Sequence, residues 1–266
     1  MSHNFRKGRP SGFRLEGLPM ILALVVGLLL AGSIIKGVIG LGMPMIAIPV
    51  LTLFIGLPQA VAIVALPVAA ANGWQCWQFR KSGRTLPFLS PFLITGSLGL
   101  LAGTVFLATA PSTLLEIGLA SVVMIYLVLR AMHPDFIMSR GTGRRLAPAI
   151  GLGSGLLHGA TGISAPIGIT YFHSMKLERP EFIFATGAMF LLYASMQVPL
   201  LGWAGFLSGT NLIYGLFAIP TSAVGLYIGN RIGRHMNPVL FDRLVLLVLC
   251  LTAGLLMWRG LSDIVT

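Results

Sequence analysis

The sequence predicts an all-α fold, a polytopic bundle of transmembrane helices. Hydrophobic residues make up 56% of the 266 positions, whereas Asp, Glu, Lys and Arg together make up 9%. Because a soluble domain carries about 25% charged residues, most of this chain's surface is expected to face lipid. The apolar residues also gather in windows of roughly 20, the length that a helix needs to cross the hydrocarbon core.

Six apolar windows are regular enough to be single crossings. They are residues 58–79, 87–109, 113–131, 182–201, 212–232 and 239–258. Two further windows, 18–55 and 146–173, are too long, since one continuous helix over the first would extend about 57 Å at ~1.5 Å per residue. Each contains several glycines, a proline and one basic side chain near its middle. We therefore expect an interruption in each.

An internal repeat relates these two long windows. The motif K-G-x-x-G-x-G-x-P begins at Lys36, and H-G-x-x-G-x-S-x-P begins at His158, which is 122 positions later (158 − 36). The same offset pairs Gln75 with Gln197, and an offset of 126 relates the later helices. The prediction is about eight spans in two pseudo-symmetric four-element repeats, with the first element of each repeat interrupted at a Gly-rich break.

The distribution of charge suggests how the chain is organised along its length. We expect a basic cytoplasmic tail at 1–17, a first transmembrane repeat at 18–131, a basic cytoplasmic linker at 132–145 and a second repeat at 146–260, because clusters of Lys and Arg favour the cytoplasmic side. One crossing per interrupted segment gives repeats of the same orientation and a cytoplasmic N-terminus. If the interrupted segments fold back as hairpins instead, the repeats invert. The first arrangement is preferred.

Composition and motifs also exclude several functions. The net charge of +11 lies in short clusters between apolar runs rather than on one basic surface, so nucleic-acid binding is not expected. Cys76 and Cys250 lie in apolar runs with no partner at metal or redox spacing. No Walker motif, Gly-x-Ser-x-Gly elbow or metalloprotease spacing is present. We predict no catalytic residue, no metal and no cofactor.

Lys36 is the strongest candidate for a functional residue. A charge within the membrane costs several kcal/mol and is a functional-site hypothesis by default, although Lys36 at the end of a short helix could also extend to the interface. Its repeat counterpart is His158, another basic side chain in a Gly-rich setting. Glycines at 40, 42, 159 and 162 permit the backbone to leave helical geometry and expose N–H groups. Such a site suits an anion.

Polar side chains on neighbouring segments complete the candidate site. Asn72 and Gln75 are three residues apart and share a helix face, and Gln197 is the repeat counterpart of Gln75. Hydrogen bonding between helices is an equally weighted interpretation, and hydroxyls such as that of Thr161 often bond their own backbone. The predicted anion-binding residues are Lys36, Gly40, Gly42, Asn72, Gln75, His158, Thr161, Gly162, Ser164 and Gln197.

Two glycine motifs and one acidic residue are predicted to have structural roles. Gly99-x-x-x-Gly103 and Gly225-x-x-x-Gly229 are small-residue stripes that let helices approach closely. Glu116 is expected at an interface near a helix start, where an acid complements the helix dipole.

The Gly-rich motifs resemble those of a known family. G-x-x-x-K-G-x-x-G-x-G-x-P from Gly32, repeated as G-x-x-H-G-x-x-G-x-S-x-P from Gly155, is similar to the sulfite exporter TauE/SafE family, also called the toluene-sulfonate uptake permeases. The resemblance extends from about residue 20 to 260. It implies secondary transport of small anions, often sulfite or sulfonates, by duplicated four-helix units in the bacterial inner membrane.

The predicted function is therefore a secondary transporter of a small organic or sulfur-containing anion such as sulfite or a sulfonate. The expected partners are this small anionic solute and the lipid bilayer. Protons are a candidate coupling ion because the charge of His158 changes near neutral pH, and a homo-oligomer is left open. The alternative is a membrane-embedded enzyme or assembly factor without transport activity. A cation carrier would require an acid inside the membrane.

Overall fold

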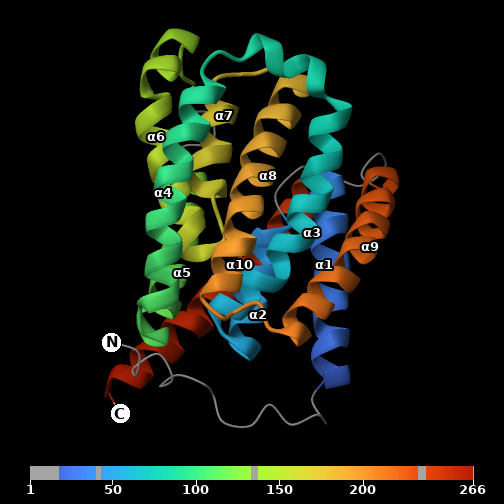
Figure 1. Cartoon of the computed structure of the whole chain (residues 1–266), viewed down its shortest axis with the longest axis vertical. Coiled ribbons are helices and arrows are strands. Elements are labelled where there is room, and N and C mark those ends of the chain that lie inside the picture. Colours follow the sequence, from blue (N-terminus) through green and yellow to red (C-terminus); the bar gives the residue numbers. More distant parts are fainter. Residues whose placement is uncertain (1–17, 40–42, 133–136, 233–237, 266) are drawn as a thin grey trace.

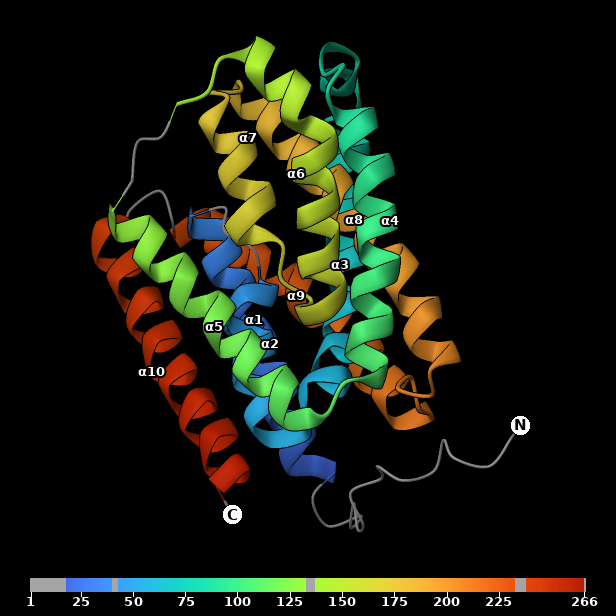
Figure 2. The same ribbon diagram turned by 90° about the vertical axis from the view of Figure 1, so that its left-hand side faces the viewer.

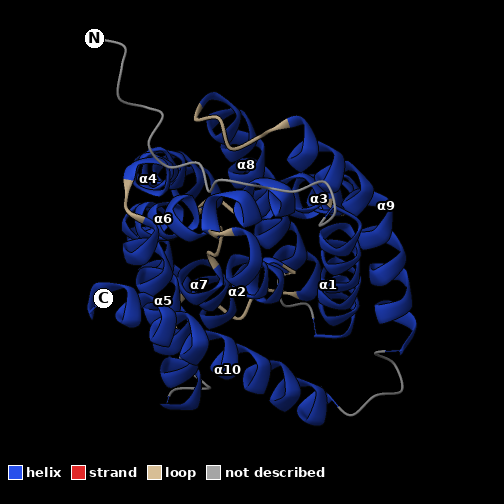
Figure 3. Ribbon diagram, turned by 90° about the horizontal axis from the view of Figure 1, so that it is seen from below, coloured by secondary structure: helices blue, strands red, loops and turns tan. Residues whose placement is uncertain are grey.

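The computed structural model describes residues 18–39, 43–132, 137–232 and 238–265, and every regular element within these ranges is helical (Figures 1 and 3). The first half contains α1 (Leu18–Ile39), α2 (Pro44–Ile55), α3 (Leu57–Gln78), the 3-10 helix η2 (Arg80–Thr85), α4 (Leu89–Thr109) and α5 (Ser112–Met132). The second half contains α6 (Arg140–Thr161), the π-helical η3 (Ala165–Ile169), α7 (Thr170–Ser174), α8 (Arg179–Trp203), α9 (Gly209–Ile232) and α10 (Pro238–Val265).

Six of the described helices are long and apolar enough to cross a bilayer, namely α3, α4, α5, α8, α9 and α10. Large apolar side chains on their outer surfaces are exposed: Ile94 of α4 is 65% exposed and Leu251 of α10 is 60% exposed. Water disfavours so much bare apolar surface, whereas lipid tails accommodate it. The chain is a multi-pass membrane protein, and the predicted all-α bundle is confirmed, although these six spans do not confirm a count of eight.

The helix bounds recur between the two halves. Both ends of α6 lie 122 residues beyond the ends of α1 (140 − 18 and 161 − 39), and α8 begins 122 residues after α3 (179 − 57). Between α5 and α10 the offset of the first residue is 126 (238 − 112). These are the offsets found in the sequence motifs.

Corresponding helices of the two halves run in opposite directions. In Figure 2, α1 and α5 ascend, whereas α6 and α10 descend. In Figure 1, α3 ascends to η2 at the upper end, and α8 descends from that end. The element that matches each helix of the first half therefore has the reverse orientation in the second.

The two halves are interleaved rather than separate. The first helix of each half packs against the third long helix of the other, α1 on α9 and α6 on α4, while α3 packs on α8 and α5 on α10. Exchanging the halves exchanges the first two pairs and leaves the last two unchanged. The core thus lies between the halves, and neither half forms a domain by itself.

Glycines make the closest of these contacts. Gly99 and Gly103 of α4 lie against the backbone of Leu152 and Leu156 in α6, where any side chain would collide. Gly229 of α9 lies in the same way against Ile34 of α1. The predicted packing role of these stripes is confirmed, since the missing side chains allow two backbones to approach.

The second interrupted segment folds back, which differs from the single crossing that we expected. α6 descends and α7 ascends (Figure 2), because Gly162 ends α6 with a φ of +72°, in the left-handed region that glycine favours. Pro166 then lies in the first turn of η3, where a proline is tolerated. Gly159 remains inside α6 and packs against Leu100 of α4, so the expectation that it leaves helical geometry was wrong.

Candidate functional site

His158 lies in the last turn of α6, at the tip of the hairpin that α6 forms with η3 and α7. Its side chain is 2% exposed, and Nδ1 is 3.2 Å from the hydroxyl oxygen of Ser164, which is fully buried. The rings of Tyr193 and Phe190, both from α8, lie 5.2 and 6.1 Å from the imidazole. The histidine is therefore held in one orientation by a hydroxyl on one side and by aromatic rings on the other.

The hydroxyl of Thr161 is used within the turn itself. It donates to the carbonyl of Leu157 at 2.7 Å, and it accepts a hydrogen bond from the backbone N–H of Ile163 at 3.2 Å. These bonds stabilise the chain reversal at Gly162. The structure therefore assigns Thr161 a structural hydrogen-bonding arrangement, and binding of a ligand by its hydroxyl stays a prediction.

Gln197 of α8 connects its helix to the end of α6. Its side chain is fully buried, and Nε2 donates to the carbonyls of His158 at 3.3 Å and Gly159 at 3.1 Å. The carbonyl of His158 also accepts the backbone N–H of Gly162 at 2.6 Å. The last carbonyls of a helix lack partners within the helix, and the amide of Gln197 supplies one for Gly159. The Oε1 atom of Gln197 has no hydrogen-bond partner in the described part of the chain.

A small cavity lies where this hairpin tip meets α2 and α3. Its volume is about 10 Å³, which is room for about one water molecule. His158 and Gln197 supply the polar side chains, and aliphatic or glycine residues form the rest. The lining residues are Pro44, Ile48, Val61, Val64, Ala65, Val68, His158, Gly162, Ala194 and Gln197.

Lys36 is connected to a lining residue of this cavity through Asn72. It occupies the last turn of α1 and its Nζ donates to Oδ1 of Asn72 at 3.0 Å. Asn72 is 2% exposed and donates in turn through Nδ2 to the carbonyl of Val68, a lining residue, at 2.7 Å. Among the described residues no carboxylate forms an ion pair with Lys36. Its charge is therefore met by an amide oxygen and not by an opposite charge.

The structure brings together some of the predicted residues and separates others. His158, Gly162 and Gln197 line the cavity, Ser164 supports His158 from behind, and the pair of Lys36 and Asn72 adjoins its wall. Gln75 is half-buried on α3, where its Cβ approaches Gly187 of α8, and it does not line the cavity. Gly40 and Gly42 lie outside the described residues.

Sequence reasoning missed the apolar walls of the cavity. Val61, Val64 and Ala194 carry no polar group, and nothing in their residue type distinguishes them from other residues of a membrane helix. One signal was present, because Ala194 lies 122 residues after Asn72 (194 − 72). At this pair of equivalent repeat positions, the first half has an amide and the second half has a small apolar residue. The two halves therefore contribute different side chains to the site.

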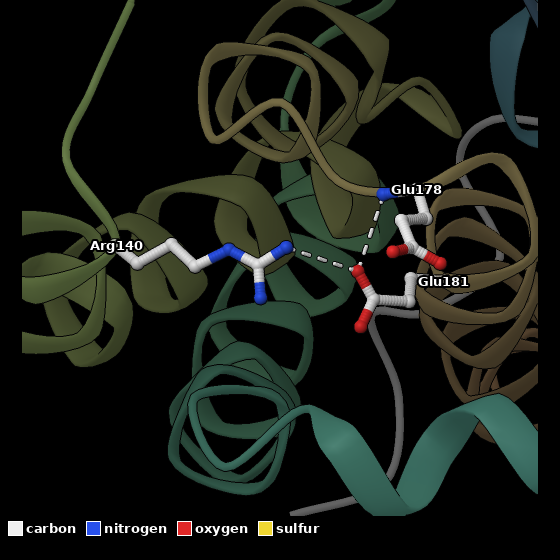
Figure 4. A network of polar contacts seen from close by, with 3 residues as sticks. All are labelled: Arg140, Glu178 and Glu181. Carbon is white, nitrogen blue, oxygen red and sulfur yellow. Dashed lines mark hydrogen bonds and ion pairs between the residues drawn. The ribbon is translucent and has the colours of Figure 1, made fainter.

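Two ion pairs lie apart from the cavity. At the start of α6, Arg140 contacts Oε2 of Glu181 at 3.3 Å, and the same oxygen accepts from the backbone N–H of Glu178 at 3.2 Å (Figure 4). This network joins the starts of α6 and α8.

The second ion pair joins α5 and α10. Nε of Arg259 lies 3.6 Å from Oε2 of Glu116, and its Nη1 donates to the carbonyl of Leu53 near the end of α2 at 2.9 Å. The side chain of Glu116 thus lies buried at a contact between helices, and its expected position at the membrane interface stays a prediction. Within the described residues no three His, Cys, Asp or Glu side chains lie close enough together to hold a metal ion.

Comparison with known proteins gives two matches. The family model described as "Sulfite exporter TauE/SafE" matches residues 23–256. A curated protein of Cupriavidus necator strain H16, named probable sulfite/organosulfonate exporter TauE, is 25% identical over 244 residues, which cover 88% of this chain and 93% of that protein. No solved structure matches the chain.

Proposed function

Since the chain belongs to the sulfite exporter TauE/SafE family, whose members are transporters and not enzymes, we propose that it is a secondary transporter of a small organic or sulfur-containing anion such as sulfite or a sulfonate. The observation that carries this proposal is the position of Lys36. A cation inside a membrane bundle, met by an amide and by no described carboxylate, is completed by a negatively charged solute. The name of the relative, at 25% identity, supports the sulfur-containing class.

The proposed binding region extends from Lys36 to the cavity. Asn72 accepts a hydrogen bond from Lys36 and donates one to the carbonyl of Val68. Val68 lines the cavity together with His158 and Gln197. The cavity has room for about one water molecule, and a sulfonate group is larger than a water molecule. Binding therefore requires α2 and α3 to move relative to the tip of α6, and such a movement is one way to open the site.

We further propose that the two halves are repeats of inverted topology that together span the membrane. The matching helix bounds, the reversed directions and the exchanged packing of α1 on α9 and α6 on α4 support this arrangement. Inverted repeats of this kind give transporters two similar conformations, each open to one side. Rocking of the halves would alternate access to the site between them.

The membrane potential is a sufficient driving force for export. An inside-negative potential of 100 mV favours outward movement of one negative charge by ~2.3 kcal/mol. Proton coupling through His158 is not required by this proposal, and the oligomeric state does not enter it.

The orientation in the membrane follows from where the basic residues lie. In Figure 1, η2 and the starts of α6 and α8 lie at the upper end, whereas the α4–α5 and α8–α9 connections lie toward the lower end. The described basic residues of the upper end are Arg80, Lys81, Arg140, Arg144, Arg145, Lys176 and Arg179. Residues 110–111 and 204–208, in the two lower connections, include no Lys or Arg.

We propose that this upper end faces the cytoplasm of a bacterial cell, with the protein in the inner membrane, because loops rich in Lys and Arg stay on the cytoplasmic side. The start of α1 then lies on the opposite side (Figure 2). This orientation differs from the cytoplasmic N-terminus expected from the sequence. That expectation assumed one crossing per interrupted segment and also used the basic cluster of residues 1–17, which by itself favours the opposite orientation.

Replacement of Lys36 tests the proposed function. In proteoliposomes the Lys36→Met variant should transport sulfite or a sulfonate at least about 30-fold more slowly at subsaturating concentration, because loss of a buried charged partner costs ~2 kcal/mol or more. Lys81→Met, which removes an exposed lysine in η2, is the matched control and should transport like the wild type. Wild-type rates in a folded Lys36→Met variant would reject the role of the lysine.

A further inference from the structure

The amide of Gln197 is fixed so that its oxygen is left over. Both partners of Nε2 are carbonyl oxygens, and a carbonyl can only accept, so the nitrogen of the amide must face α6. The oxygen is therefore directed away from these two carbonyls. It is fully buried and has no hydrogen-bond partner in the described part of the chain.

This oxygen differs from the other buried atoms without a partner. In the described ranges those atoms are Oγ1 of Thr104, Oε2 of Glu116 and Oε1 of Gln197. Glu116 has Arg259 within 3.6 Å, and Thr104 lies on the seam between α4 and α6 next to Gly159. Gln197 is the one of these three residues that lines the cavity.

An amide oxygen can accept a hydrogen bond but cannot donate one. In a buried site an acceptor that finds no donor loses the bonds that water would have made. A solute carrying only acceptor oxygens, such as a simple alkylsulfonate, would leave the Gln197 oxygen unpaired. A solute that also carries an O–H or N–H group would pair with it, and sites of this kind reject analogues that lack the group.

We propose that the transported anion carries a hydrogen-bond donor, a hydroxyl, amino or protonated oxyanion group, which Gln197 Oε1 recognises while Lys36 holds the negative end. This inference rests on the proposed function and specifies its substrate class. The two contacts come from different helices. Lys36 of α1 bonds Asn72 of α3, which bonds the carbonyl of Val68, whereas Gln197 lines the cavity from α8. Asn72 fixes the position of Lys36, and the carbonyls of His158 and Gly159 fix the position of Gln197.

A matched pair of anions tests the inference. 2-Hydroxyethanesulfonate and ethanesulfonate differ by one hydroxyl, and uptake of each into proteoliposomes is compared for the wild type, Gln197→Met and Gln78→Met. The wild type should prefer the hydroxylated anion by about tenfold or more. Gln197→Met should transport both at rates within about twofold of each other. Gln78→Met, an equal change at an exposed glutamine of α3 that does not line the cavity, should keep the wild-type preference.

The outcomes separate this inference from the proposed function. Transport of both anions by the wild type without preference overturns the donor requirement alone, and means that a water molecule in the cavity satisfies the Gln197 oxygen. A preference that survives in Gln197→Met also overturns it. Transport of neither anion, nor of sulfite, rejects the proposed function and the inference together. Because the wild-type ratio alone can overturn the donor requirement, the inference can still be rejected if Gln197→Met fails to fold.

Discussion

At the scale of single residues, the site combines one cation with amides and a buried imidazole. Lys36 is held by Asn72, Asn72 by the Val68 carbonyl, and His158 by Ser164. Each of these side chains has its position set by a neighbour before any solute arrives. A transporter gains from such fixed groups because less freedom is lost when the solute binds.

Gly162 gives a residue-scale prediction. Its φ of +72° disfavours any other residue, and an added Cβ would meet Ile48 at 2.5 Å and Val61 at 3.0 Å. Gly162→Ala should therefore lower the free energy of unfolding by about 1–3 kcal/mol and slow transport, measured by thermal melting in detergent and by flux. Gly205 is the control because it has a φ of +83° with nothing within 4 Å. Equal losses in Gly162→Ala and Gly205→Ala would show that only backbone strain matters.

Residue types predicted part of the site, and physics explains where the prediction stopped. Lys36 and His158 were identifiable because a basic group within apolar sequence is costly. Asn72 and Gln197 were identifiable as polar groups on the same segments. The hydrogen-bond partners of these side chains could not be identified in the same way. The bond from Lys36 to Asn72, and the lack of a described partner for Oε1 of Gln197, depend on the angle between helices from different parts of the chain.

At the scale of elements, glycine seams determine how close the helices lie. The contact of α4 with α6 is glycine-lined on both sides, with Gly155 of α6 against the backbone of Gly96. Within lipid, helices gain little from the hydrophobic effect when they associate, so van der Waals contact and backbone proximity dominate. The spacing of these glycines in the sequence was sufficient to predict this role.

The α4–α6 seam gives an element-scale prediction. Gly99→Ala places a methyl group against the Leu152 carbonyl and should destabilise the protein by about 1–3 kcal/mol, seen as a lower melting temperature in detergent. Gly254→Ala in α10 is the control, since nothing lies within 4 Å of that glycine. It should leave stability unchanged or raise it by up to about 1 kcal/mol. If the two variants melt alike, the seam is not closely packed.

The direction of the interrupted segments could not be predicted from element patterns. The apolar windows matched the bounds of α3, α4, α5, α8 and α9 to within three residues, whereas α10 continues seven residues beyond its window, to Val265. They did not distinguish a straight crossing from a hairpin, because a Gly-rich break permits both. The left-handed φ of Gly162 decides the second segment, and no residue pattern alone announces it.

At the scale of the whole molecule, the exchanged packing of the halves links the site to the fold. The cavity lies between α2 and α3 of the first half and α6 and α8 of the second. A shift of one half against the other therefore changes the distance between the cavity walls. The internal repeat in the sequence predicted two related halves. Only the structure shows that α1 packs on α9 and α6 on α4.

The proposed orientation gives a prediction at this scale. Both native cysteines, Cys76 and Cys250, are first replaced by Ala. A cysteine introduced by Ser208→Cys between α8 and α9 should then react with a membrane-impermeant maleimide added to spheroplasts, which lack the outer membrane. Ser82→Cys in η2 should react only after the membrane is opened. The reverse pattern would place the basic end outside and the start of α1 in the cytoplasm.

The most direct test of the account is electrically driven anion flux. Purified protein is reconstituted into liposomes loaded with sulfite or 2-hydroxyethanesulfonate, and an inside-negative potassium diffusion potential is imposed. The account predicts saturable efflux that is faster with the potential than without it and that depends on Lys36. Efflux no greater than from protein-free liposomes, with either anion and at either potential, would contradict it.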